Sequence, residues 1–340
     1  MSWKYESDIL VVGAGPVGLF TVFACGQLGM RCHVVDAFSE IGGQCIALYP
    51  EKPIYDIPGF PSVRARELIT RLREQAKPYR PKFSLDTLTT GLRRDNRWFF
   101  IQTSKGDEIL TRAVIVAAGP GAFGPNRPPL AGIEALEGTS VHYWVTDPQQ
   151  LRGKRIVIAG GGDSAVDWAI VLSDIAASVT LVHRRAKFRA SPASLSALLQ
   201  LSDNKKVDLR VPFQISALEA AEQRLEAVTI EDMDGKRETL DADVLLPFFG
   251  LSSDLSALSE FGLGIEGSTI PCDPLTMSTR ASGIFAAGDV AFYAHKEKLL
   301  VTGFSEAAIA ARSAFTYAYP DKPYHFQHST DRGVPRPVSA

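Results

Sequence analysis

The sequence predicts an α/β protein of two domains, each a three-layer ββα unit around a parallel sheet, with the second domain inserted into the first. Two stretches of similar design predict this fold: DILVVGAGPVGLFTVFACGQLGMRCHVVDA from Asp8 and RIVIAGGGDSAVDWAIVLSDIAASVTLVHRR from Arg155. Each reads as a strand, a glycine turn, a helix and a second strand. The apolar runs 9–12 and 156–158 are typical of strands buried on both faces, which together with the helix form a right-handed parallel βαβ unit.

Chain length and the C-terminal part of the chain indicate how the domains are connected. The 340 residues exceed the size at which one hydrophobic core usually stops growing. The strand-like run GIFAAGDV at 283–290 and the helical stretch after Thr302 have no third βαβ unit to join, so they complete the first domain. We therefore predict a first domain over 1–121 and 250–330, a second domain over 122–249, and a flexible tail over 331–340.

Composition excludes several classes of protein. With 45% hydrophobic and 22% charged residues and a formal net charge of −2, the chain is not built to coat nucleic acid. It has no apolar run of about 18 residues that could span a membrane, and glycines and a proline arrive too early for a secretory leader, so we expect a cytoplasmic protein. The cysteines predict no metal site, because they never fall at CxxC spacing and form no cluster with histidine: Cys25, Cys32, Cys45 and Cys272.

The first glycine turn predicts a Rossmann-like dinucleotide site. Gly13, Gly15 and Gly18 form G-x-G-x-x-G between a strand and a helix, with Pro16 inside the motif. The first glycine makes the tight turn, the second lets the backbone approach a pyrophosphate, and the third allows close packing of helix on strand. Asp36 ends the next strand, where a carboxylate accepts hydrogen bonds from ribose hydroxyls. A 2′-phosphate at that ribose would be repelled.

The second glycine turn predicts a site for a phosphorylated dinucleotide. Gly160, Gly162 and Ala165 form G-x-G-x-x-A, and the helix that follows opens with Asp163 and Ser164. No carboxylate ends the next strand; the chain supplies basic residues there instead: His183, Arg184, Arg185 and Arg189. Guanidinium groups clamp a phosphate through paired, charge-assisted hydrogen bonds, so the site predicts NADPH over NADH.

The end of the first domain points to FAD as its dinucleotide. Asp289 follows a strand and Gly288, where its carboxylate can accept hydrogen bonds from the hydroxyls of a ribityl chain. The helix that begins near Thr302 would direct its positive end toward a reduced flavin. Two sequence-distant halves that meet on one ligand suit a long cofactor.

Several motifs resemble those of the thioredoxin reductase superfamily. IGGQC at 41–45, IYDIPGFP at 54–61 and GIFAAGDV at 283–290 resemble its FAD-domain motifs, and HRRAKFRAS is similar to its NADPH motif. The resemblance implies that Gln44 and Tyr49 lie against the flavin, with Tyr49 stacked on one ring face. It also places Thr89 and Phe123 where the family contacts FAD.

The absence of a dithiol separates this chain from the thioredoxin reductases themselves. Those enzymes carry CxxC before the second glycine motif, whereas this chain has VHYWVTDPQQLRGKR, so thiol exchange with a protein disulfide is closed to it. GGGDSAVDWA, VHYWVTD and HFQHST resemble the thioredoxin-reductase-like ferredoxin–NADP⁺ reductases. That resemblance implies a homodimer in which His328, with His325 as the alternative, stacks on the flavin and Thr330 hydrogen-bonds nearby. The flavin so covered can be the chain's own or the partner's.

We therefore expect a flavoprotein oxidoreductase that passes hydride from NADPH to FAD and then single electrons to ferredoxin or flavodoxin, reversibly and without a catalytic acid or base. Two alternatives stay open. GTSVHYW at 138–144 partly matches a flavin monooxygenase motif, and a non-enzymatic flavin-binding redox sensor would bind NADPH as a ligand. A run of arginines could dock an acidic carrier or simply form a solvated helix face: Arg64, Arg66, Arg71 and Arg73.

Overall fold

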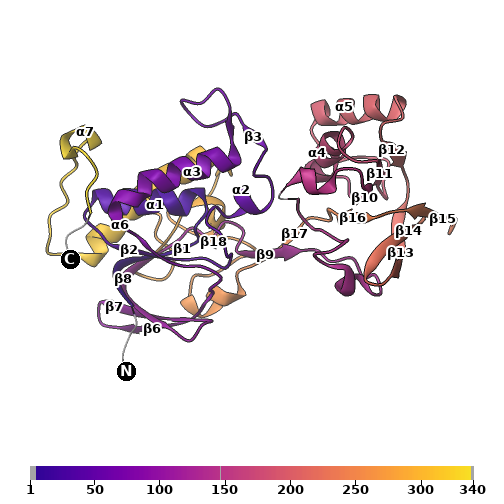
Figure 1. Ribbon diagram of the computed structural model, residues 1–340. Helices are drawn as coiled ribbons and strands as arrows, with labels where there is room; N and C mark the ends of the chain where they lie inside the picture. The colour runs from indigo at the N-terminus through magenta and orange to yellow at the C-terminus, as the bar shows by residue number, and fades with distance from the viewer. Residues whose placement is uncertain (1–4, 146, 338–340) are drawn as a thin grey trace. The chain divides into compact units, whose positions relative to one another are not determined.

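The computed structural model describes residues 5–145 and 147–337. The chain divides into two compact units (Figure 1): unit 1 comprises residues up to 123 and from 253 onward, and unit 2 comprises residues 124–252. Unit 2 thus lies in sequence between the two halves of unit 1. In the described part of the chain both units have a parallel sheet with helices on it, which confirms the predicted α/β class.

Unit 1 is built on a seven-stranded sheet in the described part of the chain, in the order β5 (Lys82–Ser84), β2 (Cys32–Val35), β1 (Tyr5–Val12), β8 (Glu108–Val116), β7 (Trp98–Thr103) and β6 (Thr89–Asp95), with β19 (Ile284–Ala286) also on β8. Strands β5, β2, β1, β8 and β19 are parallel, while β6 and β7 form an antiparallel meander. Val12 pairs with both Val35 and Val116. The carboxyl ends of the central strands therefore meet at one edge.

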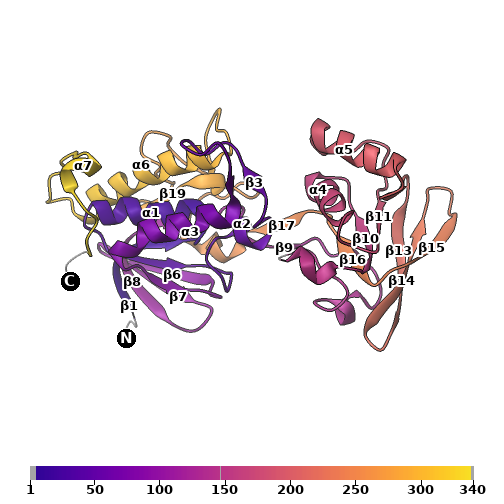
Figure 2. The same ribbon diagram turned by 45° about the horizontal axis from the view of Figure 1, so that its top comes forward.

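Helices cover one face of this sheet. Helices α1 (Pro16–Gln27), α3 (Ala65–Ala76) and α6 (Leu300–Ala318) lie side by side, with β6 and β7 on the far side from them (Figures 1 and 2). Small side chains let α6 approach α1 and β8 closely, because its inward stripe is fully buried alanine: Ala307, Ala310, Ala311 and Ala314. That packing carries the end of the chain back onto the first βαβ unit.

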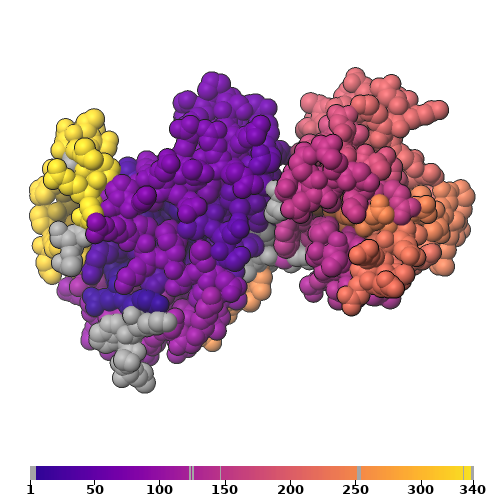
Figure 3. All heavy atoms as spheres, viewed as in Figure 1, coloured from indigo at the N-terminus to yellow at the C-terminus, as the bar shows by residue number. Residues whose placement is uncertain are grey.

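The remaining elements of unit 1 are short. They are α2 (Gln44–Ala47), the hairpin β3 (Pro53–Ile54) and β4 (Val63–Arg64), the pair β18 (Ile270–Pro271) and β20 (Ala291–Phe292), α7 (Ser329–Arg332), and 3₁₀ turns at Lys77–Tyr79, Ser256–Phe261 and Gly288–Val290. Helix α7 lies at the end of unit 1 opposite to α2 in both ribbon views. It forms part of the surface that the C-terminal segment covers in yellow in Figure 3.

Unit 2 repeats the plan on a smaller scale. Its parallel sheet has the order β12 (Asp208–Arg210), β11 (Ser178–Val182), β10 (Arg155–Ala159) and β16 (Val244–Pro247), with helices α4 (Asp163–Leu172) and α5 (Pro192–Asp203), the antiparallel ribbon β13 (Gln214–Ala221), β14 (Arg224–Glu231) and β15 (Arg237–Asp241), and 3₁₀ turns at Ile133–Leu136 and Pro148–Leu151. Strands β9 (Ala122–Pro125) and β17 (Leu251–Asp254) pair where the chain passes between the units.

Alternation along β10 shows why this strand is apolar throughout. Ile156 and Ile158 pack with the helices. Val157 and Ala159 lie on the opposite face of the sheet and pack with residues of the ribbon such as Val228. A strand covered on both faces has no polar side. The layers are therefore helix, parallel sheet and antiparallel ribbon, as the sequence predicted.

Candidate functional site

A cavity in unit 1 lies where the parallel strands end. The first residues after β1, β2, β8 and β19 all contribute to its wall, together with the start of α1, α2 and α6. Loops at the carboxyl edge of a parallel sheet are the usual place for a nucleotide in this type of fold. The predicted residues on this wall are Gly13, Gly15, Pro16, Asp36, Gln44, Tyr49, Thr89 and Asp289.

The three glycines of the first turn have three different reasons to be glycine. Gly13 has a φ of +109°, and a Cβ there would lie 2.3 Å from the carbonyl oxygen of Ala117. A Cβ on Gly18 would lie 1.9 Å from the carbonyl oxygen of Gly13, so helix α1 could not pack onto β1. A Cβ on Gly15 would meet no protein atom closer than 4.0 Å and would instead occupy the cavity wall.

The N-terminus of α1 is prepared for an anion. Gly15 is the N-cap, no side chain caps the helix, and its first turn has no acidic residue. The N–H groups of the first turn therefore have no capping side chain as acceptor, and they lie with the positive end of the helix dipole at the cavity wall. This is the arrangement that a pyrophosphate requires.

Asp36 is fixed by the backbone. Its Oδ2 accepts a hydrogen bond from the N–H of Ala14 and its Oδ1 accepts one from Phe38 at 2.8 Å. Burial raises the pKa of the Asp36 carboxyl above its ordinary value, while the two backbone hydrogen bonds act against that rise. Asp36 is only 7% exposed and lines the cavity.

The other end of the cavity gathers polar and aromatic side chains from three segments. Gln44 begins α2, Tyr49 follows it, and Thr89 begins β6. The thiol of Cys45 donates to the Tyr49 hydroxyl at 3.8 Å, and burial, the largest cause, raises the pKa of Tyr49 well above its ordinary value. Tyr49 is therefore a neutral phenol near neutral pH.

Three predicted residues do not line this cavity, and the side chain of a fourth lies outside the described part of the structure. Gly18 lies in α1, where it packs against the first turn. His328 and Thr330 are absent from the described lining; Thr330 lies in α7, and His328 is its N-cap. Both side chains are exposed, as is that of the alternative His325. The side chain of Phe123 lies outside the described part of the structure.

Unit 2 contains the second cavity, of about 730 Å³. Gly160 and Gly162 form one wall, and a Cβ on Gly162 would meet no protein atom within 4 Å. Its lining includes Arg127, which is paired with Glu137, and His183. Four more basic side chains of the lining are exposed, and no carboxylate pairs with any of them in the described part of the chain: Arg184, Arg185, Lys187 and Arg189. The cavity thus offers free guanidinium groups to an anion.

Three predicted residues of this site support the loops around the cavity. The ring of His183 lines the cavity and lies where a side chain on Gly161 would be. It contacts the ring of Phe188, with 4.7 Å between the centroids, and makes a 3.2 Å hydrogen bond through Nε2 with the carbonyl of Lys187. Asp163 accepts the N–H of Ser191 at the start of α5. Ala165 is fully buried beneath the glycine turn. Of the described residues, neither Asp163 nor Ser164 lines the cavity.

Sequence reasoning missed several wall residues. In unit 1 these include Thr87, the turn 117–121 and Leu255; in unit 2 they include Lys187 and the segments 213–216 and 248–250. Most of them contribute backbone or apolar surface, which leaves no motif. Lys187 is different, because it lies within the basic run HRRAKFRAS and could have been found from its charge.

The arginines proposed as a docking patch are largely paired. Arg64 and Arg66 both contact the carboxylate of Glu51, at 3.2 and 3.0 Å, and Arg71 contacts Glu67 at 2.6 Å. This favours the solvated helix face over a basic patch. Among residues 5–145 and 147–337, no group of three or more His, Cys, Asp or Glu could hold a metal ion. None of the helices in those ranges has the length and apolar content needed to cross a bilayer.

Two Rossmann-like units, each with a cavity at the carboxyl edge of its sheet, define a two-domain dinucleotide-dependent class of protein. The family model described as pyridine nucleotide-disulphide oxidoreductase matches residues 7–314. The chain therefore belongs to this family, which confirms the resemblance predicted from the motifs.

Comparison with individual proteins agrees with this assignment. The chain is 53% identical over 335 residues to a Paramagnetospirillum magneticum protein named ferredoxin–NADP reductase, covering 98% of this chain and 99% of that one. A Rhodospirillum rubrum protein of the same name is 54% identical over 338 residues, with 98% of each chain covered. Among solved structures, a Lactococcus lactis thioredoxin reductase matches with a TM-score of 0.77 and 24% identity over 92% of this chain and 99% of its own. That likeness shows the fold alone.

Proposed function

We propose that this chain is a ferredoxin–NADP⁺ reductase that binds FAD in unit 1 and NADPH in unit 2. The observation that carries the proposal is the contrast between the two cavities: a backbone-fixed carboxylate lies in one and unpaired guanidinium groups lie in the other. The relatives at 53% and 54% identity over nearly their full lengths carry this name, which supports the same activity here. A cytoplasmic location remains a prediction from the sequence.

FAD fits the residues of the first cavity. The bare wall at Gly15 and the uncapped start of α1 would receive the pyrophosphate, and Asp36 would receive the adenosine ribose. The carboxylate of Asp289 would accept hydrogen bonds from the ribityl chain, with Tyr49 and Gln44 toward the flavin ring. We include Thr89 and Phe123 among the contacts as proposals.

NADPH fits the second cavity for an electrostatic reason. Arg184, Arg185 and Arg189 are free to form paired hydrogen bonds with a 2′-phosphate, and Lys187 of the same basic run adds a further positive charge. NADH lacks the 2′-phosphate, so it would leave these positive charges without a partner. His183 would contact the cofactor from the cavity wall, and its hydrogen bond with the carbonyl of Lys187 also holds the loop that carries the arginines. Asp163 would act indirectly, because its hydrogen bond fixes the segment where α5 begins.

When bound, FAD accepts a hydride from NADPH and releases its electrons one at a time, which suits ferredoxin or flavodoxin as acceptor. The residues of the chain bind, orient and exclude water. Helix α6 begins with Leu300 in the cavity wall, so the positive end of its dipole would stabilise the negative charge of a reduced flavin bound there. No side chain needs to supply or remove a proton in the hydride step.

The cysteines support an acceptor outside the chain. Cys45 lines the first cavity, but burial raises the pKa of its thiol to about 11, so it stays protonated and is a poor nucleophile near neutral pH. Cys25 and Cys32 are buried. Electron transfer through an internal dithiol is therefore not part of the proposal.

The position of the tail supports a homodimer. His328 and Thr330 lie away from the cavity of their own chain, so we propose that they cover the flavin of the partner chain. This arrangement leaves the chain's own cavity to be closed by the equivalent segment of a second copy.

The decisive assay is NADPH-driven reduction of cytochrome c with and without ferredoxin. We expect reduction that requires added ferredoxin, and rapid anaerobic bleaching of bound FAD by NADPH. Steady oxygen uptake tied to a small organic substrate would favour a monooxygenase, and absence of bleaching would favour a redox sensor. Protein that purifies colourless and cannot be reconstituted with FAD would contradict the proposal.

A further inference from the structure

A buried carboxylate lies directly behind the turn that carries Asp289. Glu306, in α6, is 2% exposed. Its Oε2 accepts a 2.7 Å hydrogen bond from the backbone N–H of Gly288, the residue before Asp289. Its Oε1 accepts a 2.7 Å hydrogen bond from the hydroxyl of Tyr293 and is paired with the ammonium of Lys296.

The charge of Glu306 is balanced within the cluster. The side chains of Glu306 and Lys296 are both 3% exposed, so each is removed from water and depends on the other. Lys296 and Tyr293 belong to the segment between the Gly288–Val290 turn and α6. The ion pair thus ties this segment and the turn to one point on the helix.

Close packing also restricts the conformation of the turn, in addition to the hydrogen bond from Gly288 to Glu306. Gly288 has a φ of +78°, and a Cβ there would lie 3.2 Å from a methyl group of Val17. Gly303, in the first turn of α6, approaches the same valine, since its Cβ would lie 2.5 Å from it. Val17 of α1, Gly288 and Gly303 therefore meet closely, and Glu306 holds the N–H of the Ala287–Gly288 peptide, one residue before Asp289.

We propose that Glu306 is a positioning residue that holds the Ala287–Gly288 peptide, and with it the turn from which Asp289 binds the ribityl chain of FAD, with Lys296 and Tyr293 keeping Glu306 in place. The inference rests on the proposed binding of FAD in unit 1 and deepens it. Glu306 does not line the cavity among the described residues, so it acts through Gly288 and Asp289.

The test compares two double variants that both remove the buried charges. Glu306→Gln with Lys296→Met keeps an acceptor for the Gly288 N–H, whereas Glu306→Leu with Lys296→Met removes it. FAD affinity is measured on each apoprotein from the quenching of FAD fluorescence. We expect the dissociation constant of the Leu variant to exceed that of the Gln variant about tenfold, the usual effect of one lost buried hydrogen bond.

Coupling to Asp289 separates positioning from general loosening. Asp289→Ala is introduced into both double variants, which completes a mutant cycle. We expect this change to weaken FAD binding strongly in the Gln background and by less than a third as much, in fold-change, in the Leu background. Equal FAD affinity of the two double variants, or an equal effect of Asp289→Ala in both, would overturn the inference.

Two further variants keep the test decisive. Glu306→Asp withdraws the carboxylate by one methylene without leaving Lys296 unpaired, and it replaces the Leu variant should that one not fold; unchanged FAD affinity would again count against the inference.

Asp8→Asn is the matched control. Asp8 is a buried carboxylate of the same unit that also accepts a backbone N–H, from Arg31 at 2.7 Å, and it does not line the described cavity wall. We expect it to lower the melting temperature and leave FAD affinity unchanged.

Failure of the proposed function would look different. Wild-type apoprotein that binds no FAD at all would contradict the function, whereas tight wild-type binding with no difference between the variants would contradict only the role of Glu306.

Discussion

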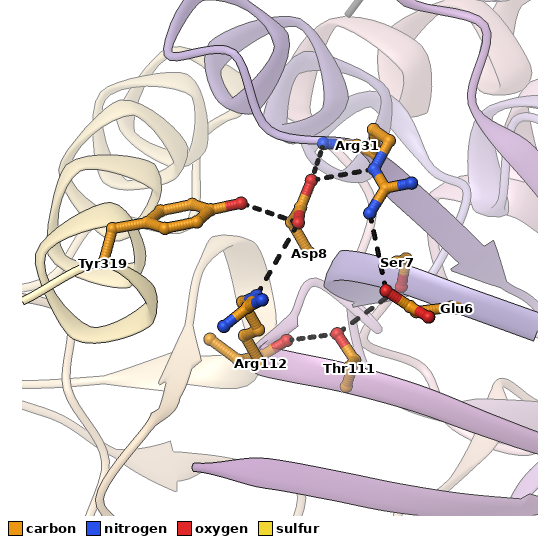
Figure 4. Close-up of polar contacts among 8 residues, drawn as sticks. Glu6, Ser7, Asp8, Arg31, Thr111, Arg112 and Tyr319 are labelled. Atoms are coloured by element: carbon orange, nitrogen blue, oxygen red, sulfur yellow. Dashed lines mark hydrogen bonds and ion pairs between the residues drawn. The ribbon is translucent and has the colours of Figure 1, made fainter. Parts of the chain in front are cut away.

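The hydroxyl of Tyr319, the residue that ends helix α6, donates a 2.6 Å hydrogen bond to Oδ1 of Asp8 in strand β1. Asp8 also accepts hydrogen bonds from the backbone and side chain of Arg31, at 2.7 and 3.2 Å, and lies 3.9 Å from Arg112 (Figure 4). The cluster joins the first strand of unit 1 to its last long helix across 311 residues of sequence. It is thus a link between the two halves of the discontinuous domain.

Loss of this link should lower the stability of unit 1 without changing its cavity. Tyr319→Phe removes one hydrogen bond to a charged group, and we expect it to lower the free energy of unfolding by about 1 to 2 kcal/mol, while Asp8→Asn should lower it by about 1 to 3 kcal/mol. Thermal unfolding of the apoprotein measures both. An effect of Tyr319→Phe that persists undiminished in the Asp8→Asn background would show that the two residues are not coupled.

The same cluster predicts a pH dependence. Burial would raise the pKa of Asp8, but hydrogen bonds from Tyr319 and Arg31 outweigh it and hold the pKa below the ordinary value. A carboxyl whose folded pKa is depressed contributes stability that is present above its unfolded pKa, about 3.9, and is lost as pH falls through the folded pKa. The stability difference between wild type and Asp8→Asn should therefore be constant above about pH 5 and shrink below pH 4. A difference that grows on acidification would contradict this assignment.

Gly15 and Gly18 should respond differently to alanine. A Cβ on Gly18 would clash with the carbonyl of Gly13, so Gly18→Ala should destabilise unit 1 itself. A Cβ on Gly15 has no protein atom closer than 4.0 Å, and Gly15 has an ordinary φ of −71°, so Gly15→Ala should fold with a nearly unchanged apoprotein melting temperature. We expect Gly15→Ala to weaken FAD binding at least tenfold. Normal FAD affinity in this variant would show that the pyrophosphate does not bind at this turn.

The local features of both sites could be predicted from sequence because their causes are local. Gly13 must be glycine because its backbone has a positive φ, and Asp36 reaches the cavity because it directly follows the last residue of β2. His183 lines the cavity, and whether it contacts a cofactor stays a prediction; the support that its ring gives to the loop depends on Phe188 and on the bare backbone of Gly161, which no sequence motif indicates. Glu306 left no motif at all, because its role depends on a turn that packing of α6 brings beside it.

The arginines of unit 2 should determine the choice of nucleotide. Arg184→Ala with Arg185→Ala removes two unpaired guanidinium groups from the cavity, and we expect kcat/KM for NADPH to fall about 100- to 10,000-fold through KM, since two charge-assisted hydrogen bonds of about 1.5 to 3 kcal/mol each are lost. NADH turnover should change less than threefold. Arg152→Ala is the control, because Arg152 is exposed, bonds Gln149 and does not line the described cavity. Equal losses for NADPH and NADH would show that these arginines do not read the 2′-phosphate.

The tail predicts a property of the assembled protein rather than of the single chain. Since His328 lies away from its own cavity and on an exposed segment, His328→Ala should leave the apoprotein melting temperature unchanged. If this ring covers the flavin of a partner, its loss should alter the visible absorbance of bound FAD and open that ring face to solvent. A mixed dimer settles which chain is involved: a subunit with His328→Ala is paired with one that carries Gly15→Ala and binds little FAD. In this dimer the FAD-loaded cavity and the variant tail are on the same chain, so we expect an unaltered spectrum, because the tail of the other chain still carries His328. An altered spectrum would show that each tail covers its own flavin.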